Sequence, residues 1–185
     1  MRGTSEHEYT ILEAYRYMLE LTNQGSKTAL KWDRNMMFKY FFVAYDSAIR
    51  GFVNMRKVLA VDGCFLTRKY GGTLLVATAQ DSENHTYPVA WCVVDSENDK
   101  SWTWFFQQLR TIVPDSDELC IISDRHNSIK KGIATIYRQA HHGFCMRHLG
   151  ENIKQKFKCA GLLQTYYMAA KAYRVEQFEE HFQQI

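Results

Sequence analysis

The stretch that decides the fold begins at Lys57 and ends at Asp95, and it reads KVLAVDGCFLTRKYGGTLLVATAQDSENHTYPVAWCVVD. It contains three short runs rich in apolar and β-branched residues. The Gly71-Gly72 pair separates the first two runs, and the polar segment 81–85 separates the last two. Both connections therefore carry turn signals, and short connections favour antiparallel neighbours. The stretch predicts a three-stranded antiparallel meander with strands at 57–62, 73–80 and 87–95.

Downstream of the meander, helical and strand-like patterns alternate. Amphipathic helices are expected at Trp102–Ile112 and Ser128–Arg138, and strands at Glu118–Asp124 and Ala140–Phe144. Three meandering strands followed by two helical crossovers build an α/β fold, with a mixed sheet of five strands and helices on its faces. This order matches the ribonuclease H-like topology, and other α/β folds share parts of it.

Helical segments are expected on both sides of this core. The assignment at 33–52 rests on aromatic and methionine side chains that recur at helical intervals and indicate a packing surface. The resulting plan has an N-terminal helical flank at 1–55, a core at 56–158 and a C-terminal helical segment at 159–185. The expected flanking helices are residues 8–24, 33–52, 146–158 and 162–184.

The whole chain has the composition of a globular protein. Of its 185 residues, 46% are hydrophobic and 23% are charged, which excludes a disordered or low-complexity chain. No apolar run approaches the roughly 18 residues of a membrane-spanning helix. The first eight residues lack the apolar stretch of a secretory signal, so an intracellular protein is expected. The five cysteines are odd in number and widely spaced, unlike a disulfide framework.

The net charge of +3 is unevenly distributed. The segment from Arg125 to Lys158 holds eight Lys or Arg residues and one acid, Glu151, so it carries a net +7 and the rest of the chain −4. A local basic patch is the electrostatic footprint expected for a phosphate backbone. A solvated helix face would have the same composition, and the sequence leaves both interpretations open. The candidate DNA-binding residues are Arg125, Lys130, Lys131, Arg138, Arg147 and Lys154.

Two carboxylates, Asp62 and Asp124, end apolar strand-like runs. If the first and fourth strands of the core are neighbours, both side chains emerge at adjacent positions on the sheet. Two close carboxylates repel each other, and a divalent cation removes that repulsion. Mg²⁺ favours a few carboxylate oxygens together with waters and substrate phosphates. The alternative is that each Asp caps the turn that follows it, a common role of this residue.

Six motifs of the chain occur in an order and spacing that resemble one family. They are Val58–Leu66, Thr73–Asp81, Tyr87–Trp91, Ser101–Phe105, Ser123–His126 and Cys145–Leu149. Together they resemble the transposase domain of Mutator-like elements (MULEs), over about residues 10–180. The resemblance implies a DDE-type transposase with a ribonuclease H-like core, which hydrolyses and joins DNA strands with two Mg²⁺ or Mn²⁺ ions. Asp62 and Asp124 match the first two acids of such a site.

The third acid of the family has no counterpart here. The family places it downstream of the Cys-x-x-His motif in an Asn-x-x-Glu-x-x-Asn-like segment, which this chain lacks. Residues 159–185 resemble the start of the family's helical insertion, truncated at Ile185. The chain is therefore expected to be a fragment that by itself neither cleaves nor joins DNA. The late acids that could substitute, without matching the motif, are Glu176, Glu179 and Glu180.

The Cys-x-x-His motif at Cys145 and His148 follows a histidine pair, His141 and His142. This spacing can place a sulfur and a nitrogen ligand on one zinc ion at the start of a helix. The two adjacent histidines would point to opposite faces of a strand, so at most three ligands would converge, whereas structural zinc needs four. The alternative to zinc is a structural Cys/His pair that packs the last strand against the next helix.

Three functions are compatible with these residues. The first is the catalytic core of a DNA transposase, acting in the nucleus on transposon ends, with a homo-oligomer as a further possibility. The second is a domesticated, inactive remnant that binds DNA or a protein. The third is a ribonuclease H-type nuclease, which would need further core acids, and Asp99 near the first crossover helix is the one candidate.

Overall fold

The computed structural model describes residues 11–67 and 71–185. They form two compact units, one that ends at Gly143 and one that begins at Phe144. The strands are β1 (Lys27–Trp32), β2 (Phe38–Ala44), β3 (Val58–Phe65), β4 (Thr73–Gln80), β5 (Thr86–Val94), β6 (Cys120–Ser123) and β7 (His141–Phe144). The described helices are α2 (Leu12–Thr22), α3 (Asp46–Phe52), α4 (Asp99–Arg110), α5 (Asn127–Ile136), α6 (Met146–Phe157), α7 (Ala160–Ala170) and α8 (Val175–Phe182).

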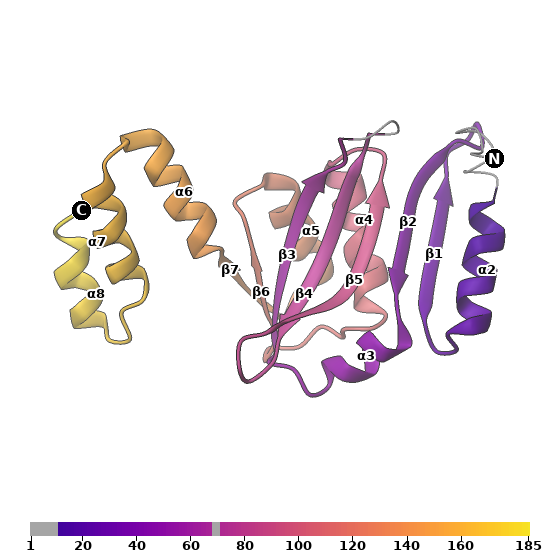
Figure 1. Cartoon of the computed structure of the whole chain (residues 1–185), viewed down its shortest axis with the longest axis horizontal. Helices are drawn as coiled ribbons and strands as arrows, with labels where there is room; N and C mark the ends of the chain where they lie inside the picture. The colour runs from indigo at the N-terminus through magenta and orange to yellow at the C-terminus, as the bar shows by residue number, and fades with distance from the viewer. Residues whose placement is uncertain (1–10, 68–70) are drawn as a thin grey trace. The chain divides into compact units, whose positions relative to one another are not determined.

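The strands form one mixed sheet in the order β1-β2-β5-β4-β3-β6-β7 (Figure 1). The expected meander is confirmed, because β3, β4 and β5 pair antiparallel in chain order. The chain then crosses through α4 to β6, which pairs in parallel with β3. Helix α5 leads on to β7, so the five expected strands lie side by side. The expectation of five strands in total was wrong, since the sheet has seven.

The two additional strands lie in the N-terminal flank 1–55, and β2 comes from a segment that was expected to be helical. Residues 33–52 contain the turn after β1, the strand β2 and the short helix α3. Strand β2 is buried on both faces, because Phe42 meets Phe105 of α4 while Phe41 meets Tyr15 of α2. A strand covered on both faces loses the alternation of apolar and polar residues. Its continuous aromatic run therefore matched helical spacing by chance.

Helices α4 and α5 pack against each other and cover one face of the sheet (Figure 1). Helix α4 begins at Asp99, three residues before the expected start. The side chain of Asn98 accepts hydrogen bonds from the backbone N–H groups of Lys100 and Ser101. The Ser101 hydroxyl in turn accepts the backbone N–H of Asn98, which completes a capping box. The core between helices and sheet is fully apolar at its centre and includes Leu59, Leu75, Val89, Trp102, Phe105, Phe106, Ile121 and Ile129.

The second unit is helical. The expected helix at 162–184 is two helices, α7 and α8, separated by residues 171–174. The Tyr166 hydroxyl donates to the carbonyl of Met146 at 3.0 Å, which ties α7 to the start of α6. Gly150 leaves room for the Tyr167 hydroxyl, which would lie 2.5 Å from a Cβ at that position. Among the helices described in both units, none has the length and apolar character needed to cross a membrane.

Candidate functional site

Asp62 and Asp124 lie at the same edge of the sheet. The parallel register of β3 and β6 pairs Ala60 with Ile122, and continuing it by two residues places Asp62 opposite Asp124. The carboxyl ends of β3, β5 and β6 all reach this edge, because β4 runs against both β3 and β5. The expected adjacency of the two strands that carry the acids is confirmed. This edge is where open α/β sheets usually bind their ligands.

The two acids differ in their local surroundings. Asp124 directly follows β6, whereas Asp62 lies inside β3, which continues for three residues beyond it. Asp62 accepts the backbone N–H of Gly63 at 2.9 Å, and Asp124 accepts that of His126 at 2.9 Å. Both side chains are half-buried. Asp124 therefore has the local turn contact that a capping role requires, whereas the contact of Asp62 is with the next residue of its own strand. Continuing the register of β3 and β6 brings the two positions together.

A further acid at this edge, Glu97, was not predicted from the sequence. Its side chain is only 14% exposed, and it accepts a hydrogen bond from the indole of Trp102 at 2.9 Å. The ring nitrogen Nδ1 of His126 lies 3.8 Å from the same oxygen. A Cβ on Gly63 would lie 3.1 Å from that oxygen, so glycine is what lets Glu97 approach β3. Glu97 thus links α4 to the residues that follow Asp62 and Asp124.

Helix α5 begins beside these residues and is fixed to α4 by Asp99. The carboxylate of Asp99 accepts the hydroxyl of Ser128 at 2.5 Å and pairs with Lys131 at 2.7 Å. These contacts lower the pKa of Asp99 below its usual range, and the contact with Lys131 has the largest effect. Asp99 therefore serves the packing of the two helices. Over the described ranges, 11–67 and 71–185, no three or more His, Cys, Asp or Glu side chains are grouped as metal ligands.

The three late acids belong to the second unit. Glu176, Glu179 and Glu180 lie on α8 in the second unit, and all three side chains are exposed. None of the three is therefore assigned as a third acid beside Asp62 and Asp124.

The Cys/His constellation is divided between the two units. His142 belongs to the first unit, where its Nε2 lies 2.9 Å from the Ser123 hydroxyl. Burial lowers the pKa of His142, and the nearby cation Lys130 lowers it further. In the second unit, Cys145 precedes α6, and His148 Nε2 lies 3.0 Å from the Arg147 guanidinium. His142 and His148 each have a local partner within their own unit.

The six candidate DNA-binding residues are likewise divided. Arg125, Lys130, Lys131 and Arg138 lie on or beside α5 in the first unit, whereas Arg147 and Lys154 lie on α6 in the second. All six are exposed or half-buried at the surface. Lys131 is engaged by Asp99, and Arg147 by Glu151 at 3.3 Å. Lys154 lies in the last turn of α6, where a cation also complements the helix dipole.

Comparison with known proteins identifies the family of the segment that contains Asp62 and Asp124. No curated protein sequence matches the chain. The sequence profile of the MULE transposase domain matches residues 58–152, which run from the start of β3 into α6 and include both Asp62 and Asp124. The match covers 95 of the 185 residues, and the chain therefore belongs to the MULE transposase domain family.

Proposed function

We propose that the chain is the core of a DDE-type transposase that cleaves and transfers DNA strands, with a ribonuclease H-like arrangement of β3 to β7. Asp62 and Asp124 supply two of its catalytic acids. One observation carries this proposal: β3 and β6 pair in parallel up to Ala60 and Ile122, two residues before the acids, inside the segment matched by the family. The meander followed by two crossovers supports the proposed topology.

The donor set at this edge fits Mg²⁺ or Mn²⁺. Mg²⁺ is usually held by one or two carboxylates and keeps its remaining positions for water and substrate phosphates. Asp62 and Asp124 provide two hard oxygen donors, and zinc would instead need Cys or His ligands. When bound, such an ion would neutralise charge that develops on the phosphate during strand cleavage. Asp62 and Asp124 would hold the ion at the sheet edge and keep it against the DNA backbone.

Basic residues near α5 would hold the DNA next to this edge. Arg125 follows Asp124 directly, and Lys130 and Arg138 lie on and after α5. Each lysine or arginine that reaches a phosphate releases condensed counterions, which makes the binding salt-dependent but independent of sequence. In the proposed function these residues position the backbone, and the place of action is the nucleus.

A second candidate function is a DNA-binding module that performs no chemistry. It is favoured by one observation: within residues 11–67 and 71–185 the two acids have no third metal-ligating side chain grouped with them. Both candidates predict DNA binding. They differ in what a divalent cation does to that binding, because only an intact acid pair would hold the cation against a phosphate.

The test is the affinity for a duplex oligonucleotide with Mg²⁺ and with EDTA at constant ionic strength. We expect Mg²⁺ to tighten binding by the wild-type chain. The variants Asp62→Asn and Asp124→Asn should bind more tightly than the wild type in EDTA, because a carboxylate that repels phosphate is gone. They should gain nothing from Mg²⁺.

The matched control is Asp117→Asn, a change of an exposed acid in the loop before β6. It should respond to Mg²⁺ as the wild type does. If Mg²⁺ weakens binding equally in all four proteins, it acts only by screening, and the module without chemistry is the better account.

A further inference from the structure

Two adjoining hollows lie beside α4, on the side of β2 and the turn that follows β1. Their volumes are about 630 and 580 Å³. They share the four lining residues Lys39, Tyr40, Asp99 and Lys100, so they form one continuous depression. We call it the α4 groove, and its remaining lining includes Lys31, Trp32, Arg34, Trp104, Glu97 and His126.

One wall of the α4 groove is a single face of a helix. Lys100, Thr103, Trp104 and Gln107 recur at the three- and four-residue spacing that brings side chains to the same side of α4. The opposite wall comes from the end of β1, the turn that follows it and the start of β2. The groove therefore exists because β1 and β2 extend the sheet beyond the expected core.

Aromatic rings are available along the groove. Trp104 packs against Tyr40 with ring centroids 5.2 Å apart, and Tyr40 itself is almost fully buried. Trp104 is only half-buried, and so is Trp32 at the other end. Trp32 contacts Phe38 edge-on, with centroids 6.3 Å apart. Two partly exposed indoles held by buried or neighbouring rings are suited to stacking on a flat ligand group.

Cations accompany these rings. Among the described residues, Arg34 and Lys100 form no ion pair, and both side chains are exposed. Lys31 lies over the ring of Tyr40, with Nζ 5.5 Å from the centroid. Of the three acids in the lining, Asp99 pairs with Lys131, Asp33 accepts backbone N–H groups and Glu97 accepts the Trp102 indole. The lining also holds four Lys or Arg side chains, one more than its acids, namely Lys31, Arg34, Lys39 and Lys100. The charge left for a ligand of the groove is therefore positive.

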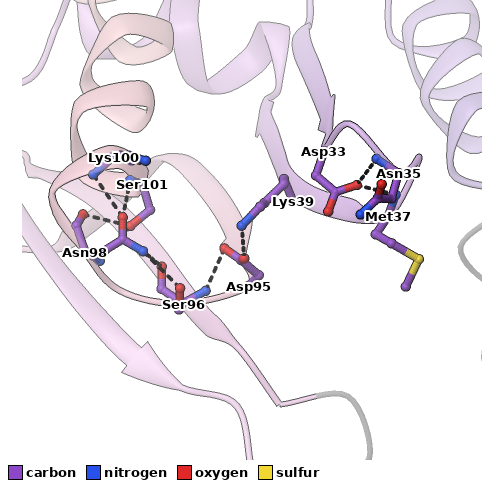
Figure 2. A network of polar contacts seen from close by, with 9 residues as sticks. All are labelled: Asp33, Asn35, Met37, Lys39, Asp95, Ser96, Asn98, Lys100 and Ser101. Carbon is purple, nitrogen blue, oxygen red and sulfur yellow. Dashed lines mark hydrogen bonds and ion pairs between the residues drawn. The ribbon is translucent and has the colours of Figure 1, made fainter.

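The rim of the groove is held by the polar network in Figure 2. One carboxylate oxygen of Asp33 accepts the backbone N–H of Asn35 at 2.8 Å and that of Met37 at 2.9 Å, which fixes the turn carrying Arg34. Lys39 pairs with Asp95, which also accepts the backbone N–H of Ser96 at 2.9 Å. These contacts join the β2 side of the groove to the loop before α4, so the lining is set before a ligand arrives.

The inner end of the groove lies in the loops that follow β5 and β6, at the carboxyl ends of these strands. Glu97 and His126 line this end, and they adjoin the residues next to Asp62 and Asp124. We propose that the α4 groove binds a single strand of DNA, with phosphates on Arg34 and Lys100 and bases on Trp104 and Trp32. The inference rests on the proposed function, because it identifies the path by which a strand approaches the acids.

The occupant follows from the combination of rings and charge. A single strand exposes the flat faces of its bases, and aromatic stacking binds them without sequence preference. A duplex hides those faces in its stack and would meet only the cations. An acidic peptide would use the cations but not the indoles.

The test is binding of a fluorescein-labelled dT12 oligonucleotide by the full chain, with EDTA present so that the acid pair plays no part. We expect the single strand to bind more tightly than a duplex of equal length. In Arg34→Gln/Lys100→Gln the slope of log K against log salt should fall by about 1.4, since each single-strand contact contributes about 0.7. Trp104→Leu should weaken binding about 5- to 150-fold.

The charge-matched control is Lys27→Gln/Arg174→Gln, which removes two exposed cations outside the groove. It should keep the wild-type slope, and thermal melting should show each variant to be folded. Because Trp104 packs against the core, Trp32→Leu gives a second test of stacking.

The proposal is overturned if the control loses as much slope as the groove variant. Tighter duplex binding, or displacement of dT12 by poly-glutamate of equal charge, also overturns it. None of these results depends on whether Mg²⁺ binds at Asp62 and Asp124.

Discussion

At the scale of single residues, the acids of the first unit differ in what engages them. Asp115 accepts the backbone N–H groups of Arg138, Gln139 and Ala140 at 2.9 to 3.2 Å, which fixes the turn between α5 and β7. Asp99, at the start of α4, is engaged by Ser128 and Lys131 of α5. Local structure thus accounts for these two acids, whereas Asp62 and Asp124 are distinguished by their register across two parallel strands. This contrast is the reason for the proposal that the latter pair carries the chemistry.

His142 gives a prediction at the same scale. Burial lowers its pKa in the folded protein, whereas the unfolded chain has the ordinary value near 6.5. As the pH falls below about 6.5, the unfolded state binds a proton that folded His142 does not, so the free energy of unfolding decreases. In His142→Gln this contribution is absent, and the decrease between pH 7 and pH 5 should be smaller than in the wild type. Urea unfolding at each pH measures the difference.

The neighbouring His141 provides the control for this prediction, because it is exposed in the same strand. His141→Gln should keep the pH dependence of the wild type. An equal slope in wild type and His142→Gln would show that His142 is protonated as readily in the folded protein as in the unfolded chain.

At the scale of elements, the contact between α4 and α5 depends on a glycine. A Cβ at Gly132 of α5 would lie 2.7 Å from the ring carbon Cδ2 of Phe106 in α4. Phe106 is fully buried and stacks on Trp102, with centroids 5.5 Å apart. The ring therefore has little room to move away. Close approach of the two helices is the physical reason for glycine at this position.

Gly132→Ala should accordingly destabilise the first unit. Alanine favours a helix by about 0.5–1 kcal/mol over glycine, but overpacking a core typically costs about 1–3 kcal/mol, so the net effect is a loss. Chemical denaturation followed by tryptophan fluorescence measures it. Gly161→Ala in α7 is the comparison, because a Cβ there meets nothing within 4 Å, and it should lose no stability. A Gly132→Ala protein as stable as the wild type would contradict the packing described for α4 and α5.

The sequence predicts elements well where one face is buried and poorly where both are. Strand β4 has its expected bounds, since Thr73, Leu75 and Ala77 are buried and alternate with half-buried residues. Strand β2 lacks this alternation and was assigned to a helix. The same division applies to the site: strand adjacency of Asp62 and Asp124 followed from the order of the elements. Glu97 could not be found this way, because its position depends on the approach of α4 to β3.

At the scale of the whole molecule, the family match and the sheet edge coincide. The matched residues 58–152 supply β3 to β7 with their crossover helices, and both acids lie within them. Strands β1 and β2 lie outside the match, yet they widen the sheet and provide one wall of the α4 groove. The proposed transposase core thus combines a matched region that holds the acid pair with a flank that, in our proposal, would guide the DNA.

The central claim is that Asp62 and Asp124 act together on one divalent cation. The most direct test is the affinity of the chain for Mn²⁺, measured by electron paramagnetic resonance in the wild type, Asp62→Asn, Asp124→Asn and the double variant, with Asp117→Asn as control. We predict that each single variant loses at least about tenfold in affinity, or 1.4 kcal/mol. The double variant should lose little more, because both acids serve the same ion. Equal Mn²⁺ affinity in the wild type and the double variant would contradict the claim.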